Sequence, residues 1–235
     1  MFISIIIPTY NEAEHIGKLV LHLKKNNSKN YEILVVDAGS LDGTQKIATN
    51  LGVQLPESPA KGRSKQMNFA AKQAKGDILY FVHADTLPPL SFFEDIKQSV
   101  AQGFHIGCYR FKFDSDKTML KLNSYLTRFD RLMCRGGDQS LFITKTLFDE
   151  LHGYCEQHQV MEDYDIIIRA RKKYPFKIIP KNVLVSARKY DYNSYLKVNI
   201  ANLTAFLMFY AKVDHDRIIK VYKKLLNHKK SELRY

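Results

Sequence analysis

The chain has 235 residues, and its 36 Lys and Arg against 24 Asp and Glu give a formal net charge of +12. This length can bury a substantial core, and α/β chains of this size often form a single domain. The charge indicates an anionic partner, whether a nucleotide, a nucleic acid or a lipid headgroup. Cys108, Cys134 and Cys155 lie far apart without metal-ligand spacing, which argues against a disulfide framework and indicates reduced thiols in a cytoplasmic protein.

The chain begins with an apolar, β-branched stretch at residues 2–7, followed by Pro8. This pattern predicts a buried parallel strand that ends at the proline. No basic region precedes the strand, so we expect no signal peptide. Apolar residues recur at helical spacing from Ile16 onward, which places residues 8–11 between a strand end and a helix start, where backbone donors face a ligand. Because no G-x-G-x-x-G follows this strand, we do not expect dinucleotide binding.

A second buried strand is predicted at residues 31–36, and it leads directly into Asp37. An acidic residue at the end of a second strand commonly binds ribose hydroxyls, and a carboxylate can also accept from a base N–H. The glycine-containing loop at residues 39–44, which includes Asp42, precedes another predicted helix. We therefore expect Asp37 to lie near a nucleotide.

Residues 62–75 predict a helix with one apolar face, because small and apolar residues recur at i, i+3, i+4 and i+7. These residues are Met67, Ala70, Ala71 and Ala74. Lys61 and Arg63 flank Gly62 at the start of this helix, and cations at a helix N-terminus favour phosphate binding. The alternative is a solvated basic turn, which is the more common origin of an isolated Lys-Gly-Arg sequence.

Residues 78–82 form a short apolar run that predicts a strand buried on both faces. The strand leads into His83 and Asp85, and the alternation of side chains along a strand would place both on the same side. The carboxyl end of a central strand is where open α/β sheets bind ligands, so Asp85 is a candidate oxygen ligand for a divalent cation that holds a diphosphate. The alternative is a turn aspartate that caps the next helix, aided by Pro88 and Pro89.

Four blocks together resemble the family 2 glycosyltransferases with the GT-A fold: IIIPTYNEAEHI at 5–16, VVDAGSLDGT at 35–44, GRSKQMNFAAKQAKGD at 62–77 and HADT at 83–86. The resemblance covers the first ninety residues or so, with the blocks in the family's order. It implies a Rossmann-like α/β fold, with a mostly parallel central sheet flanked by helices.

The resemblance also implies a nucleotide-sugar site, with Asp37 near the base and Asp85 as the last acid of the family's D-x-D metal motif. Mg²⁺ or Mn²⁺ is the expected cofactor. The first acid of that motif is replaced here by His83, which either touches the metal or packs. The motifs and charges together nominate as donor-binding residues Pro8, Tyr10, Glu12, Asp37, Asp42, Lys61, Arg63, Gln66, Asp85 and Arg188.

The middle of the chain predicts a strand at residues 104–113 and a helix at residues 120–133. Two glycines then precede Asp138 and Gln139. A glycine pair permits close approach of the backbone to a ligand, so Asp138 or Gln139 is a candidate contact. The alternative is an ordinary turn into an edge strand.

Three acids, Glu162, Asp163 and Asp165, open a predicted helix. The helix dipole favours acids at this position, which is the structural alternative to a catalytic function. In the family that the chain resembles, a Glu-Asp pair here supplies the general base. Asp163 is therefore the candidate that would take the proton from the acceptor, and Asp138 is the competing candidate.

Residues 176–185 contain two short apolar runs around residues 180–182, which predict a hairpin or a strand-turn-strand. Arg188 follows and could fold over a diphosphate, because a guanidinium binds phosphate oxygens in a bidentate manner. The Gln-x-x-Arg-Trp signature of processive synthases is absent, and the chain has no Trp. We therefore expect one transfer per encounter rather than polymer synthesis.

The C-terminal part predicts a helix over about residues 193–211, with an apolar stripe of Leu196, Ile200, Leu203, Leu207 and Tyr210. The longest uninterrupted apolar run is residues 205–211, well short of the ~20 residues that span a membrane. Residues 212–235 are rich in Lys and Arg. Two interpretations stay open: a helical pair packed on the catalytic domain, which is the commoner cause of such stripes, or an amphipathic basic surface that rests on anionic membrane near a lipid-linked acceptor.

The resemblance implies a GT-A-type domain, which we expect at residues 1–190, and the C-terminal patterns predict an amphipathic, basic helical appendage at residues 191–235. The expected function is inverting transfer of a sugar from a nucleotide diphosphate sugar to an acceptor hydroxyl or a lipid phosphate. A sugar-phosphate nucleotidyltransferase is one alternative, although its Gly-rich loop after the first strand is missing. A non-catalytic basic module that binds nucleotides or membranes is another. We expect no nucleic-acid partner, and a cytoplasmic location that includes the cytoplasmic membrane face as a peripheral site.

Overall fold

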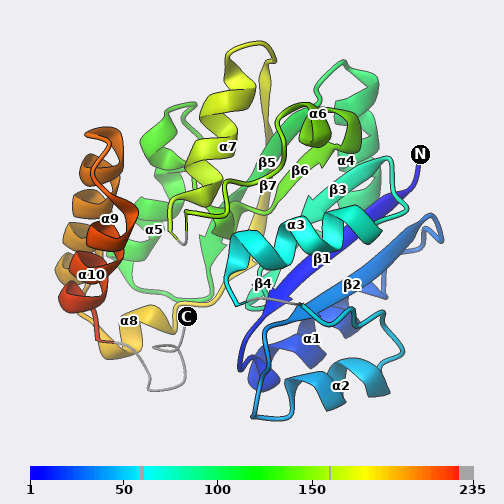
Figure 1. Ribbon diagram of the computed structural model, residues 1–235, viewed down its shortest axis with the longest axis horizontal. Helices are drawn as coiled ribbons and strands as arrows, with labels where there is room; N and C mark the ends of the chain where they lie inside the picture. The colour runs from blue at the N-terminus through cyan, green and yellow to red at the C-terminus, as the bar shows by residue number, and fades with distance from the viewer. Residues whose placement is uncertain (59–60, 159, 228–235) are drawn as a thin grey trace.

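The computed structural model describes residues 1–58, 61–158 and 160–227, and a mixed sheet runs through the centre of this part of the chain (Figure 1). The sheet has seven strands in the order β2-β1-β3-β6-β5-β7-β4. The strands are β1 (Ile3–Thr9), β2 (Tyr31–Asp37), β3 (Ile78–Phe81), β4 (Thr86–Leu87), β5 (Ile106–Phe113), β6 (Leu141–Thr144) and β7 (Phe176–Val185). The pairs β1/β2, β1/β3 and β5/β7 are parallel, whereas β3/β6, β5/β6 and β4/β7 are antiparallel.

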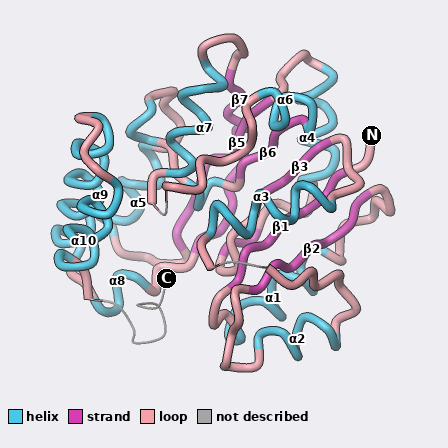
Figure 2. Tube along the Cα trace, in the orientation of Figure 1, coloured by secondary structure: helices cyan, strands magenta, loops and turns pink. Residues whose placement is uncertain are grey.

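Helices lie on both sides of the strands, as Figure 2 shows. They are α1 (Ala13–Leu23), α2 (Thr44–Asn50), α3 (Arg63–Gln73), α4 (Phe92–Ala101), α5 (Thr118–Leu126), α6 (Lys145–Glu150), α7 (Glu162–Arg171), α8 (Lys189–Tyr192), α9 (Tyr195–Tyr210) and α10 (His215–Leu225). Two short 3₁₀ turns are η1 (Leu132–Cys134) and η2 (Gly137–Gln139). The expected α/β class, with flanking helices and a C-terminal helical part, is confirmed. The sheet is mixed rather than mostly parallel as predicted, because three of its six strand pairs are antiparallel.

Two apolar cores lie on the opposite faces of the sheet, and alternate residues of β1 divide between them. Ile5 and Ile7 face the core that α1 and α4 cover, whereas Ile6 faces the core that α3, α6 and α7 cover. Every residue of β1 and β3 is buried. The prediction of first and third strands buried on both faces is therefore confirmed, and the ends of these strands are fixed by packing from both sides.

The first strand extends one residue beyond Pro8, to Thr9, so the prediction that the strand ends at the proline is wrong. Val82 N–H donates to the Ile6 carbonyl at 3.0 Å, so even-numbered residues of β1 direct their backbone groups toward β3. Since β3 ends at Phe81, the position of Pro8 needs no donor on that side. The strand thus carries its proline without losing a ladder hydrogen bond.

Two other predicted elements differ from the structure, and so does the edge strand that was the alternative for residues 141–143. Residues 176–185 form one strand rather than a hairpin, because Pro180 and Lys181 are accommodated as an irregularity between the pairs Tyr109/Ile179 and Arg110/Asn182. The helix predicted to reach residue 133 ends at Leu126. β6 is an inner strand between β3 and β5 rather than an edge strand.

The C-terminal helices α9 and α10 stand side by side at the left edge of Figure 1, next to α5. They share a small core of Val198, Ala201 and Leu226, which agrees with a packed helical pair. The face of α9 that packs is nevertheless not the predicted one, because Val198, Ala201 and Ala205 are its buried residues. Residues 228–235 of the predicted basic tail lie outside the described residues. No helix within the described ranges combines the length and apolar character needed to cross a bilayer.

Candidate active site

A polar cavity of about 80 Å³ lies at the carboxyl ends of β1 and β3. Residues from five separate parts of the chain line it, and all but Ala84 were nominated from the sequence: Pro8, Glu12, Arg63, Gln66, His83, Ala84, Asp85, Asp138 and Arg188. The parallel strands β1 and β3 end here, so the residues that follow them converge at one edge of the sheet. The cavity is therefore lined by cationic and carboxylate side chains, and it lies where this class of sheet binds ligands.

His83 and Asp85 reach the cavity through a turn rather than through strand alternation. β3 ends at Phe81, and Thr86 N–H donates back to the His83 carbonyl at 3.1 Å. The expectation that the two side chains share one side of a strand is therefore wrong, although both line the cavity. The backbone of Asp85 is fixed by a further bond, in which Ser186 N–H donates to its carbonyl at 3.1 Å.

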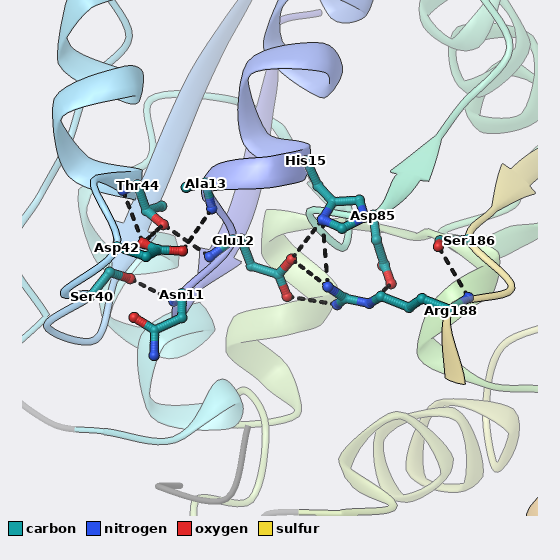
Figure 3. A network of polar contacts seen from close by, with 10 residues as sticks. All are labelled: Asn11, Glu12, Ala13, His15, Ser40, Asp42, Thr44, Asp85, Ser186 and Arg188. Carbon is teal, nitrogen blue, oxygen red and sulfur yellow. Dashed lines mark hydrogen bonds and ion pairs between the residues drawn. The ribbon is translucent and has the colours of Figure 1, made fainter. Parts of the chain in front are cut away.

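Arg188 joins two carboxylates across this cavity (Figure 3). Its Nη1 and Nη2 donate to the two carboxylate oxygens of Glu12 at 2.9 and 2.7 Å, and its Nε lies 3.1 Å from Asp85 Oδ2. Burial raises the pKa of Asp85 and outweighs the opposing charge of Arg188. Burial would also raise the pKa of Glu12, but hydrogen bonds from His15 and Arg188 lower it below its ordinary value.

The loop before α2 holds the backbone that carries Glu12 (Figure 3). Glu12 N–H donates to Thr44 Oγ1 at 2.9 Å, and Ala13 N–H donates to Asp42 Oδ2 at 3.0 Å. Asp42 also accepts from the backbone N–H and the hydroxyl of Thr44. Asp42, which was predicted to bind the nucleotide sugar, thus accepts hydrogen bonds from backbone N–H groups at the start of two helices. It affects the cavity by fixing the position of Glu12.

Asp37 is buried, and its carboxylate accepts five hydrogen bonds. The donors are Gly39 N–H, Ser40 N–H and hydroxyl, the Thr9 hydroxyl and the Gln45 amide. Gln66 donates from Nε2 to the carbonyls of Thr9 and Val36 at 2.9 and 2.6 Å. Both side chains hold the ends of β1 and β2 in place, and their contact with a nucleotide stays a prediction.

The three other nominated residues lie around the same edge of the sheet. Tyr10 is buried beneath Lys61, whose Nζ is 5.3 Å from the centre of the ring. Neither residue lines the cavity. Arg63 does, and its Nη1 lies 3.3 Å from the buried carboxylate of Glu162 at the start of α7. Arg63, the positive charge expected at the start of α3, therefore also pairs with Glu162, the first acid of the Glu-Asp pair.

His83, Gly137 and Asp163 are packed in direct contact. A Cβ added to Gly137 would lie 2.3 Å from Asp163 Oδ2 and 2.5 Å from His83 Cε1. His83 Nδ1 lies 3.2 Å from Asp138 Oδ1, in the turn that Gly137 begins. Nδ1 of His83 therefore faces Asp138 and its Nε2 lies against Gly137, and contact of His83 with a metal stays a prediction.

The two candidate bases have opposite electrostatics. Burial, together with the charge of Glu162, raises the pKa of Asp163 to about 7. Partial desolvation would raise the pKa of Asp138, but the hydrogen bond and charge of His83 lower it to about 2. Asp138 lines the cavity, whereas Asp163 lies beside it, behind Gly137. A carboxylate with a pKa near neutrality is the better matched general base, while a carboxylate on the cavity wall has the shorter path to a ligand.

The described residues contain no group of three or more His, Cys, Asp or Glu side chains arranged to hold a metal ion. The carboxylate of Asp85 nevertheless lines the cavity. It already pairs with one positive charge, the guanidinium of Arg188. Mg²⁺ and Mn²⁺ are commonly held by one or two carboxylates together with substrate phosphates. The residues present therefore fit a cation that arrives with a diphosphate, with Asp85 as its protein ligand.

Sequence reasoning missed two features of this site. It did not anticipate His15, whose Nδ1 lies 3.4 Å from Glu12 Oε2, although the i,i+3 spacing at a helix start was visible. It also missed the steric requirement at Gly137, for which the sequence holds no signal beyond the glycine pair.

The sheet with helices on both faces, and with a polar cavity at the carboxyl ends of its parallel strands, defines an α/β protein of the GT-A type. Residues 4–156 match the family model described as glycosyl transferase family 2. This chain belongs to that family.

Curated relatives include glycosyltransferase AglE of Haloferax volcanii, which is 37% identical over 101 residues, or 40% of this chain and 33% of that protein. The dolichol-phosphate mannosyltransferase of Pyrococcus furiosus is 32% identical over 112 residues, or 45% of this chain and 32% of that protein. The chain thus spans about a third of the length of these relatives.

Solved structures of low sequence identity share the fold. The mannosyltransferase PcManGT of Pyrobaculum calidifontis, in complex with GDP-Man and Mn²⁺, matches with a TM-score of 0.72 and 17% identity, over 95% of this chain and 69% of that chain. TarS 1–349 of S. aureus matches with a TM-score of 0.67 and 18% identity, over 96% of this chain and 70% of that chain. The predicted GT-A fold is confirmed by these likenesses.

Proposed function

We propose that the protein transfers a sugar from a nucleotide diphosphate sugar to an acceptor, with inversion at the anomeric carbon and with the help of Mg²⁺ or Mn²⁺. The observation that carries the proposal is the convergence of Asp85, Arg63 and Arg188 on one cavity at the carboxyl ends of β1 and β3. A diphosphate needs cations around its oxygens, and it needs them most as it leaves with its full charge. The cavity provides two guanidinium groups and a carboxylate that fits a metal.

In this mechanism Arg63 and Arg188 bind the diphosphate, and Asp85 holds the cation. When bound, the metal supplies charge stabilisation to the departing diphosphate. Glu12 orients Arg188 through its two hydrogen bonds to the guanidinium. His83 and Gly137 fix the positions of Asp138 and Asp163 on the acceptor side.

Asp163 is the proposed general base, because burial raises its pKa to about 7 and its carboxylate is fixed at the start of α7. It would take the proton from the attacking hydroxyl on the face opposite the diphosphate, which inverts the anomeric centre. Asp138 is the competing base, since it lines the cavity. For a lipid-phosphate acceptor the same carboxylate would orient the nucleophile.

The relatives differ in their donors and acceptors, so they do not identify one donor or one acceptor for this chain. PcManGT binds GDP-Man, and TarS structures hold UDP and UDP-GlcNAc. The relative in Pyrococcus furiosus is a dolichol-phosphate mannosyltransferase. These names support a nucleotide diphosphate sugar as the donor class. Family membership favours this activity over nucleotidyl transfer, which would also need a Gly-rich loop where residues 8–11 stand.

A thermal-shift panel tests the proposal. Nucleoside diphosphates and nucleotide diphosphate sugars would be compared with and without Mn²⁺, because a ligand stabilises the folded state by RT ln(1 + [L]/Kd). We expect the correct donor to raise the melting temperature by a few degrees and to do so more strongly with Mn²⁺. A panel in which no nucleotide diphosphate sugar stabilises the protein, with or without metal, would contradict the proposal.

A further inference from the structure

The exposed apolar side chains of this protein are concentrated on two neighbouring segments. Of the seventeen large apolar side chains that are exposed among the described residues, eleven lie on α9 or between residues 119 and 133. On α9 they are Leu196, Ile200, Leu203, Leu207 and Tyr210. On α5 and the turns after it they are Met119, Leu122, Tyr125, Leu126, Phe129 and Met133. These eleven residues are here named the α5–α9 surface.

The stripe on α9 follows a helical line and stays open to solvent. Its five residues are spaced 4, 3, 4 and 3 positions apart, and their exposures lie between 49% and 71%. At 1.5 Å per residue this line is about 21 Å long. α9 already packs through Val198, Ala201 and Ala205, so the stripe is a second apolar face of the same helix. A contiguous apolar face of this kind marks an interaction site.

The two segments are joined directly. Asn123 Nδ2 on α5 donates to Asn199 Oδ1 on α9 at 3.2 Å, and the Tyr195 hydroxyl donates to Asn123 Oδ1 at 2.7 Å. Figure 1 shows α5 and α9 as neighbours at the left of the view. The apolar residues therefore belong to one region of the protein rather than to two unrelated patches.

The charged residues in this region indicate which kind of partner the α5–α9 surface binds. α9 has no acidic residue, and its one charged side chain is Lys197. Lys121, Arg128 and Arg131 are interleaved with the apolar residues of the other segment. Asp130, the one acid between residues 118 and 133, is paired with Arg171. Apolar side chains flanked by Lys and Arg match an anionic bilayer surface, whereas a second copy of the chain would bring like charges together.

We propose that the α5–α9 surface rests in the interface of an anionic lipid bilayer and brings a lipid-linked acceptor to the active site. This inference rests on the proposed function and specifies its acceptor class. α9 begins seven positions after Arg188, which lines the cavity. The ring of Phe206 on α9 lies 5.5 Å from that of Tyr164, the residue after Asp163. α9 therefore follows closely in sequence on the residue that would bind the diphosphate, and it contacts α7, the helix that carries the candidate base.

Vesicle sedimentation with the full chain, without donor or metal, tests this surface. We expect binding to vesicles that contain phosphatidylglycerol, weaker binding at high salt, and no binding to pure phosphatidylcholine. The double substitution Leu203→Gln and Leu207→Gln should weaken binding at least tenfold, since it removes two inserted apolar side chains. Leu21→Gln on α1 is the matched control, because Leu21 is 54% exposed and lies outside the surface. It should leave binding unchanged.

Three outcomes would overturn the inference. The first is a full chain that ignores anionic vesicles at low salt. The second is equal vesicle binding by the double variant and the Leu21→Gln control, which would assign the binding to charge alone. The third is a dimer in sedimentation velocity that the double variant converts to a monomer, which would assign the surface to a second copy. Unchanged melting temperatures show that the variants are folded.

Nucleoside diphosphate binding, measured by calorimetry in solution with Mn²⁺, separates this inference from the proposed function. A protein that binds the nucleotide but not the vesicles retains the proposed function without a membrane surface. A protein that binds the vesicles but no nucleotide has the surface without that function.

Discussion

Arg188 and Asp85 are held together across the candidate active site, with Nε of the guanidinium 3.1 Å from Oδ2 of the carboxylate. The cation that the donor is expected to bring would compete with Arg188 for this carboxylate. Glu12 holds the other two nitrogens of the guanidinium. The cavity in this arrangement measures about 80 Å³, below the roughly 300–1,000 Å³ of ligand clefts. Donor binding should therefore move Arg188 off Asp85 and onto the diphosphate.

The first prediction concerns Arg188. Arg188→Gln should weaken metal-free binding of a nucleoside diphosphate by about tenfold or more, because a hydrogen bond to a charged group contributes about 1.5–3 kcal/mol. Titration calorimetry in the presence of a chelator measures this affinity. Arg217→Gln on α10 is the control, since Arg217 is exposed and does not line the cavity. Equal affinities of the Arg188 variant and the unmodified protein would show that the guanidinium does not contact the diphosphate.

The second prediction concerns Asp85. Asp85→Asn should abolish the gain in nucleoside diphosphate affinity that Mn²⁺ provides, and it should leave the metal-free affinity within a few-fold. The reason is that an amide is a much poorer ligand than a carboxylate for a hard cation. Parallel titrations with Mn²⁺ and with a chelator give both values. Asp77→Asn, at the other end of β3, is the matched control, and it should keep the full Mn²⁺ effect. A variant at Asp85 that keeps this effect would rule out Asp85 as the metal ligand.

The first three strands could be predicted from the sequence because their residues are apolar on both faces. β1, β2 and β3 each read as short β-branched runs followed by polar residues, and the structure places them side by side. β7 could not be predicted correctly, because Pro180 and Lys181 resemble a turn locally. Pairing with β5 over both halves of β7 overrides that local signal.

The contents of the cavity were more predictable than the contacts within it. Residues that follow strands gather at one edge of a sheet, so eight nominated side chains line the cavity. The pair between Glu12 and Arg188 joins positions 176 residues apart, and no local pattern encodes it. The predicted apolar stripe of α9 was present but faces solvent, since periodicity reports a face and not what covers it.

The third prediction concerns the general base. Asp163→Asn should lower kcat by roughly 10²–10⁴ with little change in donor affinity, because a general base acts in the transition state. In the unmodified protein kcat should rise with pH through about 7, where Asp163 loses its proton. Stopped or continuous assays across pH 5.5–8.5, a range of about three units chosen to bracket this value, give both results. If Asp138→Asn abolishes turnover while Asp163→Asn retains it, the base is Asp138.

The fourth prediction concerns stability and follows from the same carboxyl. The folded-state pKa of Asp163 is raised to about 7, above an unfolded value of about 3.9. The folded protein therefore holds this proton between these pH values while the unfolded chain does not. The contribution of Asp163 to the free energy of unfolding should fall as the pH rises from about 4 to about 7. Urea titrations at several pH values should show that Asp163→Asn flattens this dependence, and an unchanged slope would contradict the raised pKa.

The fifth prediction compares two adjacent glycines. In Gly137→Ala the added Cβ would lie 2.3 Å from Asp163 Oδ2 and 2.5 Å from His83 Cε1, so the turn that carries Asp138 must shift. Overpacking of this kind typically costs about 1–3 kcal/mol, and a shift of this turn should also reduce kcat strongly. In Gly136→Ala the added Cβ meets no atom within 4 Å, and φ of 170° is extended backbone that alanine adopts.

Gly136→Ala should therefore keep both its melting temperature and its activity, which makes it the control for an alanine in this loop. Melting curves and initial rates of the two variants separate the effect of the contact from that of losing a glycine. If both variants lose activity equally, the flexibility of the glycine pair is what the site requires. If only Gly137→Ala loses activity, the close packing of His83, Gly137 and Asp163 is what places the two candidate bases, because residue 137 lies against Asp163 and directly precedes Asp138.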